Sequence, residues 1–543
     1  MAILTPNRGE ADTRGRELPR PADGHWPGLF DRPKAPVRAL VARQLLRPAI
    51  RDLPFRLRFP DGTSWGAGGI AAPTLSVTDP GALFARLGRD GLIGLGEAWM
   101  TGDLTTGDWH VGHDEADPAV LDAATDELAA ALTVLAARTA ALVPRAMRTM
   151  RHLWQRRQPD DEANTVTGAR ENIHRHYDLS NDLFELFLDP TMTYSSALFP
   201  DERLPAAVHT AAVHTAVVAS GPASGVGAGD PSGAPVSGGG PISPGGADSP
   251  GSAASFGGRT CPGDQASSGG AAAPGGAVLP GGAARGRANP AAEITTAHAT
   301  DTLHTAQLAK IDSILDLAGV RSGMHVIEIG SGWGALAIRA AAERGATVTT
   351  LTLSTEQQRL AQARIAQRGL SDRIDVRLED YRVHASAHPG RYDAAVSVEM
   401  IEAVGERYWP DYFSAVDRLL RPGGRFGLQA ITIDHPRLLE TRGQYTWIHK
   451  YIFPGGILPS LTAIEEVLRD HTALRIVAAR RLGHSYARTL QTWRHRFNAH
   501  AARAKELGFD ETFRRMWTFY LAYSQAGFAA DYIDDWQLSI ARG

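Results

Sequence analysis

The chain has 543 residues, of which 43% are hydrophobic, and a formal net charge of −3 at pH 7. This length predicts two or three domains, and the small net charge argues against a general nucleic-acid-binding protein. The one cysteine, Cys261, excludes an intrachain disulfide, and we expect neither thiolate chemistry nor a metal site.

Residues 1–45 are polar and rich in proline and arginine, which predicts a disordered, basic N-terminus. They contain no apolar core of a signal peptide, and no later window is long and uncharged enough to cross a bilayer. Eight basic residues and one acid lie between Arg32 and Arg58, and a second basic cluster spans residues 145–157. Each cluster is either an ordinary solvated face or a surface for anionic phospholipid.

Residues 46–118 predict a small α+β domain. The segment 55–65 alternates apolar and polar residues around Asp61-Gly62, which predicts a hairpin, and residues 72–79 predict another strand. Two short helices are expected at 80–91 and 93–102. A connecting segment, 119–160, begins with a helix expected from Ala119 to Leu142, where leucines recur at helical spacing.

Residues 161–203 combine a compact helical stretch, "HYDLSNDLFELFLDP", with "MTYSSALF" at 192–199. Residues 204–292 consist mostly of Gly, Ala, Pro and Ser, and cannot bury enough apolar surface to offset the entropy of ordering. We therefore expect a disordered insertion. Because loop entropy grows slowly with length, such an insertion can interrupt a domain without destroying it.

From residue 293 to 543 strands and helices alternate, which predicts a doubly wound, Rossmann-like parallel sheet with ligands at the carboxyl ends of its strands. Strands are expected at 325–330, 346–354, 374–380, 392–400 and 425–433, and helices at 305–320, 332–345, 355–369 and 408–424.

The segment "VIEIGSGWGALA" carries the main chemical signal. Gly330, Gly332 and Gly334 follow a strand, and Glu328 precedes the first glycine by two positions. The spacing G-x-G-x-G differs from the dinucleotide fingerprint G-x-G-x-x-G and resembles motif I of class I S-adenosylmethionine-dependent methyltransferases. No P-loop lysine is present, which disfavours phosphoryl transfer.

Several further segments occur in the order known from one family: "HYDLSNDLFELFLDPTMTYSSALF", "LTLSTEQ", "LEDYR", "SVEMIEAVGERYWPDYF", "LRPGGRFGLQAITI", "HKYIFPGGILPS" and "GHSYARTLQTW". Over about 164–200 and 293–543 the chain resembles the cyclopropane-fatty-acyl-phospholipid synthases, including the branch that makes 10-methylene stearoyl and tuberculostearic lipids. The small N-terminal domain is similar to the lipid-substrate domain of its bacterial members.

The resemblance implies a class I methyltransferase fold that binds S-adenosylmethionine. Tyr194 and Ser195 would close over its methionine end. The remaining cofactor-binding residues would come from the strand ends: Glu328, Gly330, Gly332, Gly334, Thr352, Leu353, Gln357, Asp380 and Tyr381.

In this family the donor methyl group is transferred to a cis double bond, and a base then removes a proton from the carbocation. The resemblance implies a bound bicarbonate as that base, held by Glu402, Tyr486 and the backbone of Ile431. Ser196 and Gln429 stand at that site where relatives commonly carry Cys and His, and Ser524 replaces a further cysteine. A cysteine nucleophile is thereby excluded, and ring closure is put in doubt.

We therefore expect an enzyme that converts an unsaturated phospholipid acyl chain into a cyclopropane or a 10-methylene product. The alternatives are a small-molecule or free-lipid methyltransferase on the same fold, and a catalytically inactive lipid-binding protein. Expected partners are an anionic membrane surface, a reductase acting on a methylene product, and a second copy of the chain in a homodimer. The expected location is cytoplasmic, at the inner face of the membrane.

Overall fold

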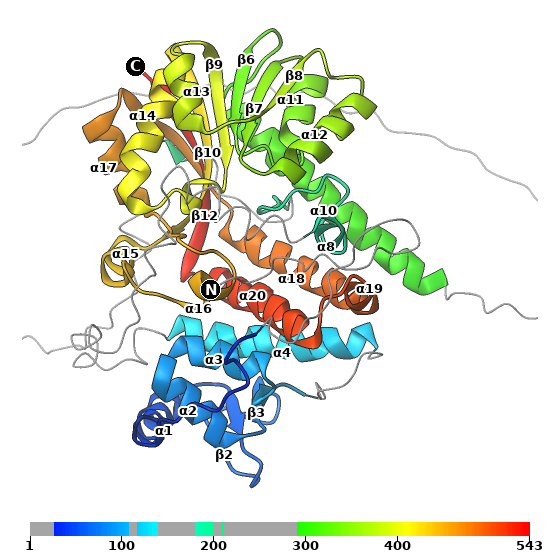
Figure 1. The fold of residues 1–543 in the computed structure, drawn as a ribbon, viewed down its shortest axis with the longest axis vertical. Coiled ribbons are helices and arrows are strands. Elements are labelled where there is room, and N and C mark those ends of the chain that lie inside the picture. The colour runs from blue at the N-terminus through cyan, green and yellow to red at the C-terminus, as the bar shows by residue number, and fades with distance from the viewer. Residues whose placement is uncertain (1–25, 108–116, 139–179, 200–207, 210–289) are drawn as a thin grey trace, which may run out of the picture. The chain divides into compact units, whose positions relative to one another are not determined.

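The computed structural model describes residues 26–107, 117–138, 180–199, 208–209 and 290–543 (Figure 1). Within these ranges no helix combines the length and the apolar character that crossing a bilayer requires. Cys261, the second basic cluster, most of the expected insertion at 204–292 and the first part of the segment 161–203 lie outside them.

The N-terminal part is the predicted small α+β unit. Phe55–Trp65 forms the expected hairpin, in which Leu57 pairs with Trp65 and Gly62 takes a φ of 80°. Its four-stranded sheet has the order β2-β1-β3-β4. The elements are α1 (Pro36–Ile50), β1 (Arg56–Arg58), β2 (Ser64–Trp65), β3 (Thr74–Val77), α2 (Pro80–Asp90), α3 (Leu92–Met100), β4 (Leu104–Thr105) and α4 (Pro118–Ala137).

Helix α1 shows that the prediction of disorder for residues 1–45 was wrong from Pro36 onward. Proline is favoured in the first turn of a helix, where its missing N–H has no partner to lose. The helix also rests on the small domain, because Arg43 and Arg47 lie over the rings of Phe84 and Trp65 at 6.0 and 5.7 Å.

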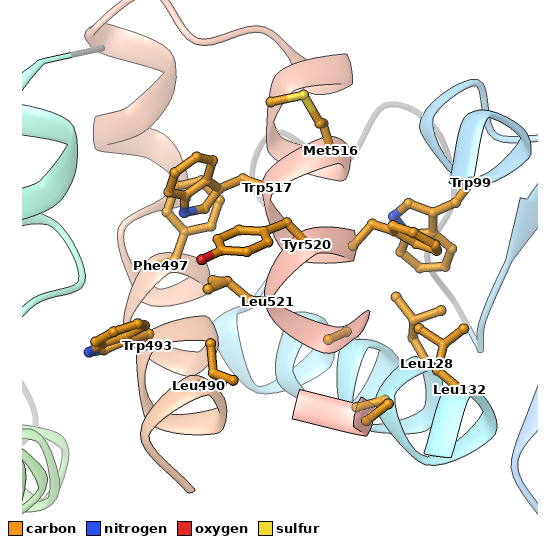
Figure 2. Close-up of a cluster of buried hydrophobic side chains, with 14 of the residues drawn as sticks. Trp99, Leu128, Leu132, Leu490, Trp493, Phe497, Met516, Trp517, Tyr520 and Leu521 are labelled. Carbon is orange, nitrogen blue, oxygen red and sulfur yellow. The ribbon is translucent and has the colours of Figure 1, made fainter. Parts of the chain in front are cut away.

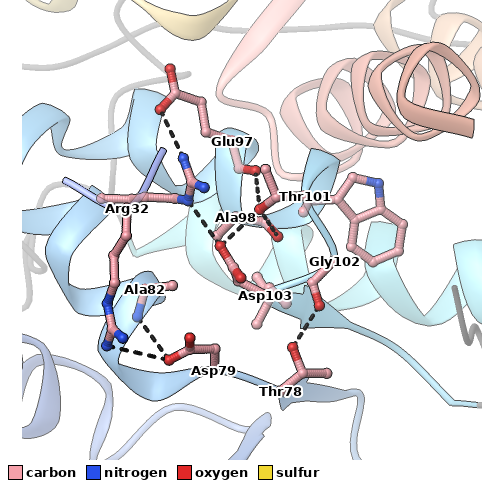
Figure 3. Close-up of polar contacts among 12 residues, drawn as sticks. Arg32, Thr78, Asp79, Ala82, Glu97, Ala98, Thr101, Gly102 and Asp103 are labelled. Atoms are coloured by element: carbon pink, nitrogen blue, oxygen red, sulfur yellow. Dashed lines mark hydrogen bonds and ion pairs between the residues drawn. The ribbon is translucent and has the colours of Figure 1, made fainter. Parts of the chain in front are cut away.

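Polar contacts fix the turns of this unit (Figure 3). Asp79 caps α2 by accepting the backbone N–H of Ala82 at 2.9 Å. Asp103 accepts hydrogen bonds from Arg86 Nε and from Thr101 Oγ1, each at 2.8 Å. Both donors converge on Oδ2 of Asp103, which ties α2 and the end of α3 to the turn before β4.

The C-terminal part is built on an eight-stranded sheet of order β5-β11-β12-β10-β9-β6-β7-β8. Strands β8, β7, β6, β9 and β10 are parallel, as predicted. The strands are β5 (Val208–His209), β6 (His325–Ile329), β7 (Thr347–Thr352), β8 (Ile374–Leu378), β9 (Tyr392–Val398), β10 (Leu420–Ile433), β11 (Leu474–Arg481) and β12 (Ile533–Arg542).

The sheet is mixed, which corrects the expectation of an all-parallel one. Strand β12 inserts antiparallel beside β10, with Gln429 opposite Gln537, and β11 and β5 continue the antiparallel edge. Strand β12 was not predicted because Asp535, Gln537 and Ser539 are polar yet buried, so its hydropathy pattern does not look like that of a central strand.

Helices cover both faces of this sheet (Figure 1). One core is formed with α10, α11 and α12, and the other with α13, α14 and α17. The helices and 3-10 turns are α8 (Asn181–Glu185), α10 (Pro290–Leu317), α11 (Ala335–Arg344), α12 (Thr355–Gln367), α13 (Tyr381–Ala387), η3 (Ile401–Ala403), η4 (Glu406–Tyr408), α14 (Trp409–Leu419), α15 (His435–Thr441), α16 (Trp447–Tyr451), α17 (Leu461–His471), α18 (Gly483–Ala499), α19 (Ala501–Glu506) and α20 (Glu511–Ala529).

The small N-terminal unit shares one hydrophobic core with α18 and α20 (Figure 2). Trp99 of α3 and Leu128 of α4 are fully buried in the same cluster as Trp517 of α20. Trp99 Nε1 donates to the Arg515 carbonyl at 3.0 Å, and Arg515 Nε donates back to the Trp99 carbonyl at 2.6 Å. Buried Glu97 of α3 also pairs with Lys450 of α16 at 2.5 Å. The two parts are therefore joined by core packing.

Candidate active site

The glycine loop lies between β6 and α11. Gly330, Gly332 and Gly334 all have positive φ, at 95°, 47° and 86°. A Cβ built on Gly330 would lie 2.9 Å from Met400 Cγ, whereas one on Gly332 would meet nothing within 4 Å. The backbone at Gly332 therefore borders open space that no side chain fills. Such a cradle fits a ligand that must approach the main chain closely, as S-adenosylmethionine would.

The next strand brings together the residues expected on the ribose side. Thr352 ends β7, and its Oγ1 donates to Gln357 Oε1 at 2.8 Å. Ser354 caps α12 by accepting the Gln357 backbone N–H at 3.2 Å, and Leu353 between them is half-buried. The fold thus holds the Gln357 side chain against the end of β7.

At the end of β8, Asp380 and Tyr381 are both buried. Asp380 caps α13 and takes two hydrogen bonds from the Arg382 guanidinium, at 2.9 and 2.6 Å. The Tyr381 ring meets Tyr412 edge-on, with centroids 5.4 Å apart. Asp380 is thus already paired with an arginine.

Glu328 lies inside β6 and faces β7, since Thr350 Oγ1 donates to its carboxyl at 2.6 Å. Burial raises the pKa of Glu328 to about 8, and the hydrogen bond from Thr350 opposes that shift. The carboxyl is therefore largely neutral near pH 7, which lets a buried acid sit in the centre of the sheet.

Residues 192–199, which follow α8, form the side of the site opposite the glycine loop. The Tyr194 hydroxyl lies 2.8 Å from the Tyr520 hydroxyl, and its ring stacks on Trp493 with centroids 5.2 Å apart. Ser195 Oγ accepts a hydrogen bond from Lys310 Nζ at 2.6 Å. Burial lowers the pKa of Lys310 to about 8, against the attraction of nearby Glu399. Lys310, on α10, was not predicted as a site residue.

Glu399 forms the centre of the site. Its Oε1 accepts the backbone N–H of Ser196 and the side-chain amide of Gln429, each at 2.8 Å. Its Oε2 accepts the hydroxyl of Tyr486 at 2.6 Å. Three of the predicted residues, from three distant segments, thus converge on one carboxylate that the sequence analysis did not select.

The Gln429 side chain is held in one orientation. Its Nε2 donates both to Glu399 and to Asp535 Oδ2, the latter at 3.0 Å, while its Oε1 accepts from Gln537 Nε2 at 3.0 Å. Gln537 in turn accepts from Ser313 Oγ at 2.5 Å. Because both amide hydrogens of Gln429 donate hydrogen bonds, the orientation of its side-chain amide is defined and no further donor is available.

Glu402, which was predicted to hold bicarbonate at the catalytic site, has different hydrogen-bond partners. Its Oε1 accepts the Ile431 backbone N–H at 2.5 Å, as expected for these two residues. Its Oε2 is buried and has no hydrogen-bond partner among the described residues. Burial, and next the charge of Glu399, raise the pKa of Glu402 to about 8. Glu402 is therefore the acid that keeps its proton near neutral pH.

Asp535 behaves in the same way, because burial and then the charge of Glu399 raise its pKa well above the ordinary value. Burial also raises the pKa of Glu399, but hydrogen bonds from Tyr486 and Ser196 and the charge of Lys310 oppose that shift. Of the three carboxyl groups, Glu399 has the strongest support for its ionised form.

The predicted residues Ser196, Gln429, Ile431, Glu402 and Tyr486 thus lie together. The residues expected to hold or line a bicarbonate site offer four donors, Ser196 N–H, the Gln429 amide, Tyr486 O–H and Ile431 N–H, and each already donates to Glu399 or Glu402. The Ser196 hydroxyl donates to the Ala197 carbonyl at 3.0 Å. These residues do not fit a bicarbonate ion, because Glu399 and Glu402 take the hydrogen bonds that the ion would need.

Comparison with known proteins places this chain in a family. The family model of mycolic acid cyclopropane synthetase matches residues 164–216 and 294–538. The chain is 40% identical over 520 residues to tuberculostearic acid methyltransferase UfaA1 of Mycobacterium tuberculosis, covering 95% of each protein. It is 36% identical over 243 residues to the cyclopropane-fatty-acyl-phospholipid synthase of Escherichia coli K12, covering 45% of this chain and 60% of that one.

Among solved structures, the cyclopropane synthase MmaA2 of Mycobacterium tuberculosis is similar, with a TM-score of 0.47 and 24% sequence identity. That match covers 69% of this chain and 98% of the other.

Proposed function

The chain belongs to the mycolic acid cyclopropane synthetase family of S-adenosylmethionine-dependent methyltransferases, and from this premise we propose that it methylates a cis double bond in an unsaturated phospholipid acyl chain. The product would be a 10-methylene or a cyclopropane acyl lipid. The observation that carries the proposal is the 40% identity to tuberculostearic acid methyltransferase UfaA1 along 95% of the chain. That relative favours the branched-chain product over the ring.

S-adenosylmethionine supplies an electrophilic methyl group on a positively charged sulfur. The loop at Gly332 would take its backbone-facing part, with Gln357 and Asp380 at the neighbouring strand ends. Tyr194 and Ser195 would close the site from the other side. This assignment of residues to the two sides of the methyl donor is supported by the open space beside Gly332. It is also supported by the hydrogen bonds that join Tyr194 to Tyr520 and Ser195 to Lys310.

An alkene is a weak nucleophile, so the site must hold its carbons close to the methyl group and keep water away from the resulting carbocation. Aromatic side chains support this role. Tyr194 packs on Trp493, and Tyr486 stacks on Phe528 with centroids 4.4 Å apart. Such rings exclude water, and their faces attract positive charge.

The cation is discharged by loss of a proton. Loss from the new methyl with carbon–carbon bond formation gives a cyclopropane, whereas a hydride shift before that loss gives an exocyclic methylene. The family resemblance implies bicarbonate as the proton acceptor. We derive no step through that ion, because its expected donors are bonded to Glu399 and Glu402.

We further propose that the small N-terminal unit docks on an anionic membrane. Helix α1 exposes Val37, Leu40 and Val41, at 73, 58 and 46%, on one side at helical spacing. Basic residues at 38, 43, 47 and 51 share the same helix and its end. An apolar stripe beside arginines suits the boundary between headgroups and acyl chains. The acyl chain would then need to leave the bilayer only in part.

The proposal is tested by incubating purified full-length protein with S-adenosylmethionine and vesicles of an oleoyl phospholipid. Fragmentation mass spectrometry should find acyl chains heavier by one CH₂, and NMR should identify methylene or cyclopropane protons. Unchanged vesicles, together with methylation of a free fatty acid or a small molecule, would favour the alternative methyltransferase. Binding of vesicles without turnover of the methyl donor would favour an inactive lipid-binding protein.

A further inference from the structure

Glu399 has a backbone conformation that is unusual for its residue type. It follows β9 with a φ of 50°, one of three non-glycine positive-φ residues in the described part of the chain. Its backbone N–H donates to the Gln429 carbonyl at 2.8 Å, which holds it there. A left-handed conformation is sterically disfavoured for a residue that carries a side chain. Strain of this kind is retained mainly where the direction of a side chain matters.

The position of Glu399 joins the two halves of the site. The next residue, Met400, contacts the glycine loop, since its Cγ lies 2.9 Å from a Cβ built on Gly330. Its hydrogen-bond partner Ser196 directly follows Tyr194 and Ser195 of the closing segment. The carboxylate therefore lies between the loop proposed to bind the methyl donor and the segment proposed to close over it. Glu399 as a whole residue is half-buried, and its carboxylate accepts hydrogen bonds from Ser196, Gln429 and Tyr486.

Burial raises the pKa of Glu399, and its hydrogen bonds and the charge of Lys310 oppose that shift. Lys310 is the nearby cation, and Glu402 and Asp535 are the nearby acids. Burial, and next the charge of Glu399, raise the pKa of both acids, which favours their protonated forms. Tyr486 also stays protonated, since burial and the charge of Glu399 raise its pKa well above the ordinary value. Of the three acids, Glu399 accepts hydrogen bonds from a backbone N–H, an amide and a hydroxyl, and these stabilise its ionised form.

We propose that the carboxylate of Glu399 is the base that takes the proton from the methylated acyl chain, in the place that a bicarbonate ion would otherwise fill. This inference rests on the proposed function and names a catalytic residue for it.

The step balances without an external reagent. The double bond forms a carbon–carbon bond to the donor methyl as the sulfur–carbon bond breaks, leaving S-adenosylhomocysteine and a carbocation. The Glu399 carboxylate then accepts a proton from the new methyl. The electrons of that C–H bond form the ring bond directly, or form the exocyclic double bond after a hydride has shifted from the methylated carbon to the cationic carbon. Glu399 is left neutral and returns its proton to solvent before the next turnover.

The experiment measures lipid methylation by the purified full-length protein in buffer freed of carbon dioxide, with and without added bicarbonate. The wild type should turn over equally in both. Glu399→Gln keeps the shape but loses the basicity, and should lower kcat by about 100-fold or more. Glu399→Gly suits the positive φ, frees the donors, and should regain at least about 10-fold in rate when bicarbonate is added.

Binding of S-adenosylmethionine by calorimetry shows that each variant is folded, and Glu343→Gln on the surface of α11 serves as a control. Wild-type turnover that requires added bicarbonate, or a Glu399→Gln variant that retains its rate, would overturn the inference. A wild type that methylates no lipid in either buffer would instead contradict the proposed function. The wild-type comparison decides the question even where a variant does not fold.

Discussion

The Tyr486 hydroxyl donates to Glu399 Oε2 at 2.6 Å, and this bond joins α18 to the end of β9. It opposes the effect of burial on the pKa of Glu399. Removing it should therefore raise that pKa further and leave less carboxylate at neutral pH.

Tyr486→Phe should accordingly move the rising limb of kcat/KM against pH to higher pH, and lower the rate near pH 7 by about 10-fold, the effect of one charge-assisted hydrogen bond. The measurement is a pH profile of lipid methylation. Tyr392→Phe removes a buried hydroxyl bonded to His384 at 2.6 Å, distant in the fold, and should leave the profile in place. An unchanged limb in Tyr486→Phe would contradict the assignment of the proton acceptor.

Gly332→Val should abolish binding of S-adenosylmethionine, because its side chain would occupy the open space over the loop. Gly390 provides a matched control, since it also has a positive φ, of 63°, and also has nothing within 4 Å of a built Cβ. Gly390 precedes β9 at the amino end of that strand, whereas the glycine loop follows the carboxyl end of β6. Gly390→Val therefore carries the same backbone strain without blocking the cradle. Calorimetric titration should separate the two, and equal binding by both variants would refute the placement of the ligand.

Glu402→Gln should change how stability depends on pH. The pKa of Glu402 is about 8 in the fold, against an ordinary 4.5, so the folded chain holds a proton that the unfolded chain releases across that range. Stability contributed by this group is thus present below pH 4.5 and lost as the pH rises toward 8. The slope is at most about 1.4 kcal/mol per pH unit.

The free energy of unfolding by urea, measured between pH 5 and 8, should therefore fall less steeply for Glu402→Gln than for the wild type. Glu343→Gln, on the surface, is the control and should keep the wild-type slope. Parallel curves for Glu402→Gln and wild type would show that Glu402 does not hold a proton in the fold.

Replacing Val37, Leu40 and Val41 by serine should weaken binding to anionic vesicles without changing turnover of a detergent-dispersed lipid. The three side chains leave water on docking, and each contributes an apolar term. Vesicle sedimentation at low and high salt separates this term from the arginine contribution, which salt should weaken. Val383→Ser on α13, where Val383 is 55% exposed, is the matched control. Salt-independent binding, or no effect of the triple change, would contradict docking through α1.

Much of the site could be predicted, because its residues lie at strand ends and in motifs. Ser196, Gln429, Glu402 and Tyr486 were all selected from the sequence, and the structure brings them together. Glu399 was missed although it stands in the same segment, "SVEMIEAVG". Glu399 and Glu402 stand three positions apart, and the sequence pattern alone does not distinguish their roles. Only the positive φ after β9 turns the first of them toward the donors.

The other missed residues share one physical cause, which is polar burial. Lys310 lies on the apolar side of a helix that the periodicity of Ile311 and Ile314 predicted correctly, yet its amine is buried on Ser195. Asp535 and Gln537 lie on β12, a central strand that was not predicted because its sequence is too polar for a buried strand. Such groups are stable only because each has a partner, and partners from distant segments leave no local signal.

The shared core also decides how the small N-terminal unit can be studied. Trp99 is fully buried against α20, and Arg515 exchanges hydrogen bonds with it across the boundary. Deleting the first 110 residues would expose that core, so lost activity in such a truncation would not identify a lipid-docking role. Substitutions on the outer side of α1 are the cleaner probe.

The central claim is that this site transfers a methyl group to a lipid double bond and then removes a proton from that same methyl. It is tested most directly with S-adenosylmethionine carrying a fully deuterated methyl group and oleoyl phospholipid vesicles. The account predicts lipid acyl chains that retain two of the three deuterium atoms, for a methylene or a cyclopropane product alike. Chains that carry all three deuterium atoms, or none, would contradict it.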